Sequence, residues 1–259
     1  MEFVEVGDPA NPADPFTDGS IGSVPYAFRM AKYEVTNAQY VTFLNSVDQL
    51  GNNSRQLYVG GMSGPQGGIT LDLSRASGQK YEAKPSRGNH PVTYLSYFSA
   101  LRFANWLHGG DTESGAYTLT SVEPSTSPQR NPDARFWVPN RDEWHKAAYY
   151  HGSNSPLRPI YGTDYSLYPM GGFVANADDP TGAINSANFS NAVGDFVPVG
   201  SYSGSFSHYG TADQGGNAEE WYDRGENTRP GWLGGSFRDG SKSLQAGVGS
   251  GTTTGGDRE

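Results

Sequence analysis

The chain reads Gly-Gly-Asn-Ala-Glu-Glu-Trp from Gly215 to Trp221 and Gly-Gly-Ser-Phe from Gly234 to Phe237. Glycine pairs at the start of both motifs are typical of tight turns rather than of long helices or strands. From residue 151 onward the sequence predicts no helix, only loops and short strands of two to five residues. We therefore expect loops to dominate the second half of the chain.

Before residue 151, capping signals predict three helices. Thr36 with Gln39, and Asn140 with Glu143, form capping boxes at the starts of two of them. Ser96 begins the third, which a glycine pair ends. Strands are expected within residues 26–35, 69–73, 117–119 and 135–139. The pattern predicts an α+β fold with little regular secondary structure, in one domain over residues 1–259.

Composition excludes several classes of function. The net charge of −9 argues against nucleic acid as a partner, because phosphate binding requires a basic face. No apolar run reaches the roughly 18 residues that a membrane span needs. The chain has no cysteine, which excludes disulfides, thiolate metal sites and cysteine nucleophiles.

Four segments, taken in order, carry a resemblance to a known family. They are Lys32-Tyr33-Glu34-Val35-Thr36-Asn37-Ala38-Gln39-Tyr40; Pro91-Val92-Thr93-Tyr94 with Ala104-Asn105-Trp106-Leu107; Arg135-Phe136-Trp137-Val138-Pro139 with Glu143-Trp144 and Ala147-Ala148; and Tyr209-Gly210 through Asp213 with the two glycine-rich motifs. In order and spacing, residues 26–237 resemble the formylglycine-generating enzyme (sulfatase-modifying factor) family. The resemblance implies an elaborated C-type-lectin-like fold.

The sequence departs from that family at the position where its chemistry would lie. Formylglycine-generating members bind copper through a cysteine pair just after the Gly-Gly-Ser segment, whereas residues 237–243 contain no sulfur. Copper(I) prefers thiolate ligands. The chain therefore lacks the ligands that hold copper for the family's oxidase activity, and we expect no catalytic residues. An oxidase with a cysteine-independent metal site stays open as the alternative. A three-histidine iron site drawn from distant loops also stays open.

The ends of the chain favour an exported protein. The opening Phe3-Val4-Glu5-Val6 resembles the mature start of secreted bacterial members, so we expect a signal peptide to have been removed. Family members continue beyond the position that corresponds to Glu259 into a closing strand, so we expect this sequence to have been trimmed before that strand. The expected location is outside the cell or at its surface.

Calcium is the expected cofactor, with a structural role. A tight turn would bring together Asp213, the Gly216 and Ala218 carbonyls and Glu220, which are the hard oxygen ligands that Ca²⁺ prefers. The family also binds calcium through this stretch. The resemblance implies a second site, at Asn188, the Phe189 carbonyl, Asp195 and the Val197 carbonyl. Alternatively, Asp213 and Glu220 only cap turns.

The segment after Gly231 has the composition of a recognition surface. The candidate ligand-binding residues are Trp232, Phe237, Arg238, Asp239, Lys242 and Gln245. Alternatively, Trp232 and Phe237 belong to the core. The expected function is a non-catalytic binding module for a protein or other extracellular ligand, and a structural extracellular protein stays open. Variable proteins of diversity-generating retroelements resemble this chain in fold and carry their variable positions after a Gly-Gly-Ser segment, here residues 237–258.

Overall fold

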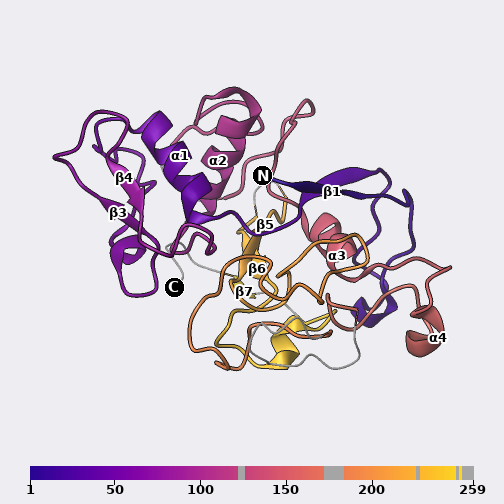
Figure 1. Ribbon diagram of the computed structural model, residues 1–259. Coiled ribbons are helices and arrows are strands. Elements are labelled where there is room, and N and C mark those ends of the chain that lie inside the picture. The colour runs from indigo at the N-terminus through magenta and orange to yellow at the C-terminus, as the bar shows by residue number, and fades with distance from the viewer. Residues whose placement is uncertain (122–125, 172–183, 226–227, 249–250, 253–259) are drawn as a thin grey trace. The chain divides into compact units, whose positions relative to one another are not determined.

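The computed structural model describes residues 1–121, 126–171, 184–225, 228–248 and 251–252 (Figure 1). The chain divides into two compact units, each assembled from separate segments. Unit 1 comprises residues 1–34, 139–222 and 232–251, and unit 2 comprises residues 35–138, 223–231 and 252–259. The prediction of a single domain stays a prediction.

Unit 1 is built from short elements. Strands β1 (Phe3–Val6) and β2 (Phe28–Ala31) pair antiparallel, with Val6 opposite Phe28. Strands β5 (Glu220–Tyr222), β6 (Gly231–Leu233) and β7 (Gly251–Thr252), whose residues belong to unit 1 except for Gly231 and Thr252, form a sheet in that order. Helices α3 (Arg141–Tyr149) and α4 (Arg158–Tyr161) and two 3₁₀ helices, Pro15–Thr17 and Ser241–Leu244, complete it. Trp144, Tyr165 and Tyr222 are central to its core.

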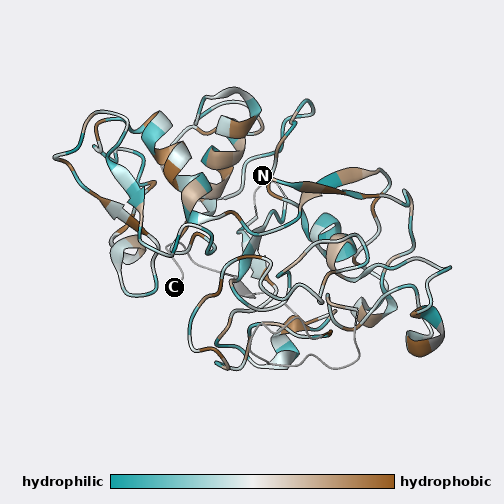
Figure 2. Ribbon diagram, viewed as in Figure 1, coloured by the Kyte–Doolittle hydropathy of each residue, from teal (hydrophilic) through white to brown (hydrophobic). Residues whose placement is uncertain are grey.

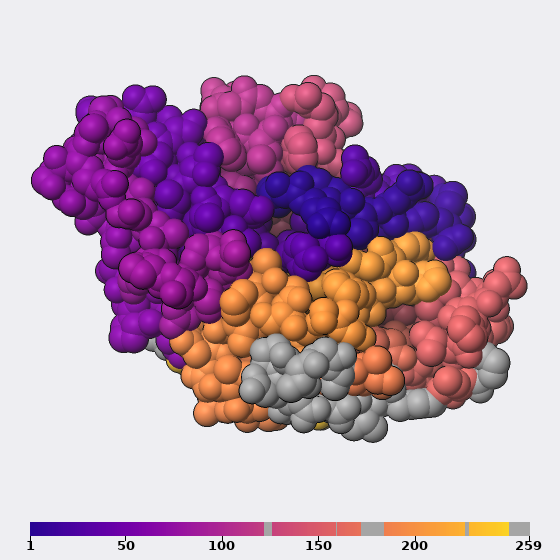
Figure 3. Space-filling model, viewed as in Figure 1, coloured from indigo at the N-terminus to yellow at the C-terminus, as the bar shows by residue number. Residues whose placement is uncertain are grey.

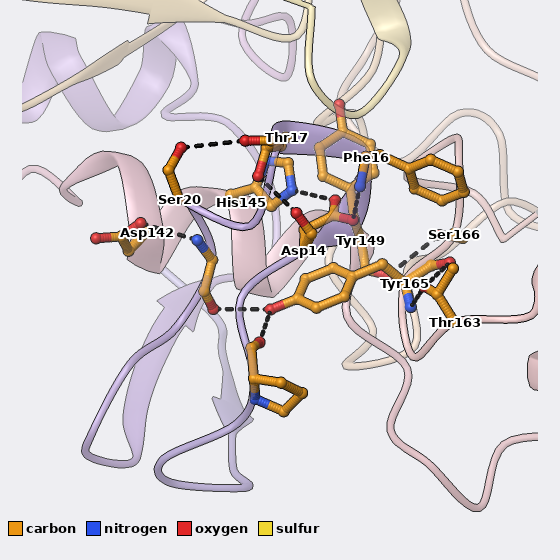
Figure 4. A network of polar contacts seen from close by, with 12 residues as sticks. Asp14, Phe16, Thr17, Ser20, Asp142, His145, Tyr149, Thr163, Tyr165 and Ser166 are labelled. Carbon is orange, nitrogen blue, oxygen red and sulfur yellow. Dashed lines mark hydrogen bonds and ion pairs between the residues drawn. The ribbon is translucent and has the colours of Figure 1, made fainter.

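The turn-rich N-terminal segment is fixed to α3 by a buried polar network (Figure 4). The Nε2 atom of His145 lies 2.7 Å from Oδ2 of Asp14, and both side chains are buried. The other oxygen of Asp14 accepts a hydrogen bond from the Phe16 backbone N–H at 2.9 Å. The Tyr165 hydroxyl donates to the Gly22 carbonyl at 2.9 Å. Long-range bonds therefore order a segment that has little regular structure of its own.

Unit 2 contains the two longer helices, α1 (Asn37–Val47) and α2 (Tyr97–Gly109), and the antiparallel pair β3 (Ile69–Leu71) and β4 (Tyr81–Ala83). A 3₁₀ helix also lies at Gly60–Ser63. Both helices carry hydrophobic residues among hydrophilic ones (Figure 2). The rings of Tyr40 and Phe43 in α1 pack against that of Phe103 in α2, with centroid distances of 6.0 and 5.4 Å respectively. This aromatic cluster is the core of the unit.

The three predicted helices are confirmed, because their signals are local. Thr36 and Asn140 cap α1 and α3 in complete capping boxes, and Ser96 caps α2. None of the helices in the described ranges has the length and apolar character that crossing a bilayer requires.

Three predictions of secondary structure need correction. Residues 117–119 and 135–139 form no strand, although Tyr117 makes an isolated bridge with Arg130. In the second segment, the Val138 N–H donates to the Tyr117 hydroxyl at 3.1 Å, so a side chain takes the place of a neighbouring strand. After residue 151 the chain does contain the single-turn helix α4, which is too short to show a helical period.

Candidate functional site

The loop from Asp213 to Glu220 is a tight, left-handed turn in unit 1. Asp213, Gly216 and Asn217 have φ angles of 63°, 86° and 59°. A Cβ atom on Gly216 would lie 2.3 Å from the Asn188 carbonyl oxygen, so only glycine fits there. The Gly216 N–H donates to the Gly234 carbonyl at 3.0 Å. The two glycine-rich motifs of the sequence are therefore hydrogen-bonded to each other.

Asn217 connects several segments of unit 1 through its buried side chain and its backbone carbonyl. Its Oδ1 accepts from Asn188 Nδ2 at 3.1 Å and from the Val197 N–H at 3.0 Å. Its Nδ2 donates to Glu34 Oε2 at 2.9 Å and to the Val197 carbonyl at 3.3 Å. Its backbone carbonyl accepts from the Phe237 N–H at 2.9 Å. All four hydrogen-bonding positions of the amide are therefore used.

Three carboxylates of the same unit interact electrostatically. Glu34 Oε1 accepts from the Ala218 N–H at 3.1 Å, Asp213 Oδ2 accepts from the Gly200 N–H at 2.6 Å, and Glu220 accepts from the Trp144 indole. Burial raises the pKa of Glu34 well above its ordinary value, and the charges of Asp213 and Glu220 raise it further.

The pKa values of the other two acids are raised as well. Burial raises the pKa of Asp213 to about 6. Burial, with a contribution from the charge of Asp213, raises that of Glu220 to about 8. Because these groups oppose one another's ionisation, the cluster favours either a bound proton or a nearby cation.

Hydrogen bonds link residues of the second predicted calcium site, but through the amide nitrogen of Asn188 and the backbone carbonyl of Asp195 rather than through the predicted side-chain oxygens. Asn188 Nδ2 donates to the Asp195 carbonyl at 2.9 Å, and Asn217 joins Asn188 to Val197. The Phe189 carbonyl already accepts from the Ala192 N–H at 3.1 Å. Asn188 Oδ1 is buried and has no hydrogen-bond partner. A buried, unpaired amide oxygen is a donor atom that suits a hard cation.

The chemistry of these donors limits which ion they could hold. Among the described residues, no three His, Cys, Asp or Glu side chains lie close enough together to hold a metal ion. A cation at either position would need amide and backbone carbonyl oxygens in addition to carboxylates. Calcium is the ion that accepts such a mixed oxygen set.

A small polar cavity lies beside Asp213. The hydroxyl-bearing residues Ser186, Ser205, Ser207 and Thr211 line it, and its volume is about 10 Å³. Such a cavity has room for a single water molecule. It is too small to hold an organic substrate.

The predicted recognition residues divide into three groups. Trp232 and Phe237 are buried; their rings pack against Trp221 at 5.9 Å and Phe196 at 4.8 Å respectively. Of the two alternatives that the sequence left open for these aromatic residues, the one that places both in the core is confirmed, so neither side chain is available as a surface contact.

Two of the remaining four residues make hydrogen bonds within the chain. Asp239 Oδ2 accepts from the Ser236 N–H at 2.8 Å, and Gln245 Nε2 donates to the Tyr168 hydroxyl at 2.7 Å. Arg238 and Lys242 are exposed. Ligand binding by this set stays a prediction, now centred on the two cations.

The sequence interpretation did not assign Glu34 and Asn217 to the site. Both lie within the segments that carry the family resemblance, Glu34 between Tyr33 and Val35 and Asn217 between two predicted calcium ligands. The available signal for Glu34 was a single acidic residue between hydrophobic ones, at the end of the segment 26–35 that was predicted to contain a strand. Its partners lie about 180 positions away in sequence, beyond the reach of local patterns.

Comparisons with known proteins bear on the family and the fold of the chain. The sequence profile of the sulfatase-modifying factor enzyme 1-like domain matches residues 20–251. The solved structure of CarF has a TM-score of 0.59 at 23% identity, over 99% of this chain and 94% of that one. The structure of Treponema denticola variable protein 1 has a TM-score of 0.53 at 14% identity, over 98% and 90%. No curated protein sequence matches the chain. At these identities, both structures show a shared fold alone.

Replacing Asn217 by alanine should destabilise the protein strongly. Asn217→Ala leaves buried groups of Glu34, Asn188 and Val197 without partners, so the free energy of unfolding should fall by about 3–4 kcal/mol. Urea denaturation measures the loss, with the exposed Asn52→Ala as the control. A loss below about 1 kcal/mol would contradict the assigned network.

The stability of the metal-free protein should rise as the pH falls. Because Glu220 has a pKa near 8 in the folded state and about 4.3 when unfolded, the folded state binds the extra proton between those values. In EDTA, the free energy of unfolding should rise by on the order of 2 kcal/mol from about pH 8 to pH 5. Urea denaturation at each pH measures it. Equal slopes for wild type and Glu220→Gln would refute this assignment.

Proposed function

The chain belongs to the sulfatase-modifying factor enzyme 1-like family, and on that premise we propose that it is a non-catalytic, exported binding module of bacterial origin. It presents a C-terminal recognition surface on a calcium-stabilised, lectin-like scaffold. Its partner is a protein or another extracellular ligand, and nucleic acid is disfavoured by the net charge of −9.

The observation that carries the proposal is the change of chemistry after the Gly-Gly-Ser turn. Residues 237–243 contain no sulfur where catalytic relatives place a cysteine pair. The same segment instead has two exposed cations, Arg238 and Lys242, beside the buried Phe237. Exposed charged side chains support recognition rather than redox chemistry.

Two calcium ions would occupy the two loops of unit 1. One would be held by Asp213 and Glu220 with the Gly216 and Ala218 carbonyls. The other would be held by Asn188, Asp195 and the carbonyls of Phe189 and Val197. Mutual repulsion of buried carboxylates and the unpaired Asn188 Oδ1 support the assignment. Bound calcium would supply charge neutralisation and fix loops that form few regular hydrogen bonds.

A specific form of the binding module is a variable protein of a diversity-generating retroelement. The fold likeness to Treponema denticola variable protein 1 supports it. The candidate variable segment is residues 237–258, of which residues 249–250 and 253–258 lie outside the described part of the chain. That segment is composed mostly of Gly, Ser, Thr, Asp and Arg.

Calcium should bind and stabilise the protein. Isothermal titration should give one or two equivalents, and calcium at about 100 times its Kd should raise the free energy of unfolding by about 2.7 kcal/mol. The Trp144 indole donates to Glu220, so its fluorescence should change, and Trp144→Phe identifies that signal. Glu220→Gln should weaken binding, whereas the neighbouring Glu219→Gln should not. Stoichiometric copper or iron in the purified protein would overturn the non-catalytic assignment.

Gene copies from one population should differ mainly within residues 237–258 if the chain is a variable protein. The buried Phe237 and Leu244 should change least, because core packing constrains them, and the exposed Arg238 should change most. Sequencing many copies measures this distribution. Identical copies, or differences spread evenly along the chain, would remove the retroelement assignment and leave the binding module.

A further inference from the structure

The chain contains three peptide bonds that join an aspartate to a proline. They are Asp8–Pro9, Asp14–Pro15 and Asp179–Pro180, the last of which lies outside the described residues. The carboxylate of an aspartate reaches its own backbone carbonyl carbon through a five-membered ring, so it is a nucleophile held beside the peptide bond. Proline is a suitable leaving group, because its nitrogen departs as a basic secondary amine. The surroundings of each bond decide whether this reaction is favoured.

The backbone on both sides of Pro9 is strained. Asp8 and Ala10 have φ angles of 51° and 60°, in the left-handed region. That region is uncommon for residues other than glycine, and a residue before proline favours extended backbone. The pairing of β1 with β2 holds one side of the turn, and the Ala10 N–H holds the other by donating to the Val24 carbonyl at 2.8 Å. Cutting the chain between these two anchors would release the strain.

The backbone carbonyl of Asp8 accepts a hydrogen bond from a buried lysine. Lys146 of α3 donates from Nζ to the Asp8 carbonyl oxygen at 2.8 Å. The Lys146 side chain is fully buried, with its ammonium group 5.9 Å from the centroid of the Tyr150 ring. Burial lowers the pKa of Lys146, and the charge of Asp8 opposes that shift. A charged donor at this oxygen makes the carbonyl carbon more electrophilic and stabilises the oxyanion that forms when the carbon is attacked.

The Asp8 carboxylate and the bond that follows it are open to solvent. Asp8 and Pro9 are exposed, and Figure 3 shows the N-terminal part of the chain, in indigo, at the surface of unit 1. The Tyr209 hydroxyl donates to Oδ2 of Asp8 at 3.0 Å, which orients the carboxylate. Water therefore has access to the Asp8–Pro9 bond.

The Asp14–Pro15 bond has a different environment and serves as an internal control. The Asp14 side chain is buried, and both of its oxygens are engaged. Oδ1 accepts from the Phe16 N–H at 2.9 Å, and Oδ2 lies 2.7 Å from Nε2 of His145. These bonds stabilise the carboxylate and make it a poor nucleophile.

We propose that the folded chain cleaves its own Asp8–Pro9 peptide bond. Oδ1 of Asp8 attacks the Asp8 carbonyl carbon while Lys146 donates to the oxyanion. The C–N bond to Pro9 then breaks, and the departing nitrogen takes a proton from water, which leaves a cyclic anhydride and a hydroxide ion. The hydroxide opens the anhydride, so one water molecule is consumed, Asp8 gains a second carboxylate and Pro9 becomes a secondary amine. Strand β1 is then held by non-covalent contacts alone.

This activity goes beyond the proposed binding function and involves neither predicted calcium site. Incubation of the purified full chain in neutral buffer tests it, with intact-mass measurement and N-terminal sequencing as readouts. Cleavage before Pro9 should be about a hundredfold faster than cleavage before Pro15, since the loss of one oxyanion donor costs about that factor. In urea the two rates should become similar, because the strain and the lysine contact both need the folded chain.

Two variants test the assigned roles. Lys146→Met should slow cleavage before Pro9 about a hundredfold, whereas Met in place of the exposed Lys242 should not. Asp8→Asn should stop cleavage, because an amide is a much weaker nucleophile than a carboxylate. Asparagine tolerates the left-handed conformation and keeps an oxygen for the Tyr209 hydroxyl, so the turn should be preserved.

Three outcomes would overturn the proposal: an intact Asp8–Pro9 bond after prolonged incubation, equal rates of its cleavage in native buffer and in urea, or cleavage that protease inhibitors abolish. Each of these comparisons uses the wild-type chain, so they decide the question even if Lys146→Met does not fold. The proposed binding function stands or falls separately.

Discussion

The fully bonded amide of Asn217 is the interaction on which unit 1 depends. The described residues of this unit form few hydrogen-bonded strand pairs, so buried backbone groups in its loops need side chains as partners. Asn217 supplies two donors and two acceptors at one point and joins Glu34, Asn188 and Val197. Its left-handed backbone conformation places its carbonyl on the Phe237 amide, a geometry that asparagine tolerates better than most residues.

Buried asparagines serve the same purpose elsewhere in the chain. Asn37 in unit 2 donates to the carbonyls of Arg87 and His90, which lie in a loop rather than a strand. Asn105 accepts from the Tyr117 N–H at 2.7 Å and donates to the Tyr117 carbonyl, as a neighbouring strand would. Loops gain a defined structure in this way, because short polar side chains pair with backbone groups that have no neighbouring strand.

Because the described part of unit 1 consists mostly of loops and short elements, the candidate site is also built from loops. Loops held by single side chains bring acids from distant positions together, and the mutual repulsion of their charges favours a bound proton or a nearby cation. A recognition face on such a scaffold can differ in its exposed residues, such as Arg238 and Lys242, while Phe237 and Leu244 keep the core constant.

The sequence by itself determined the three longer helices, because a capping box such as Thr36 with Gln39 acts within four residues. It also determined the family and the absence of a thiolate metal site. Only the tertiary structure decided that Trp232 and Phe237 are buried, that residues 135–139 form no strand, and that Glu34 meets Asn217. These outcomes depend on contacts with residues far away in the chain. The free energies of burial and hydrogen bonding that select such contacts are not visible in short sequence patterns.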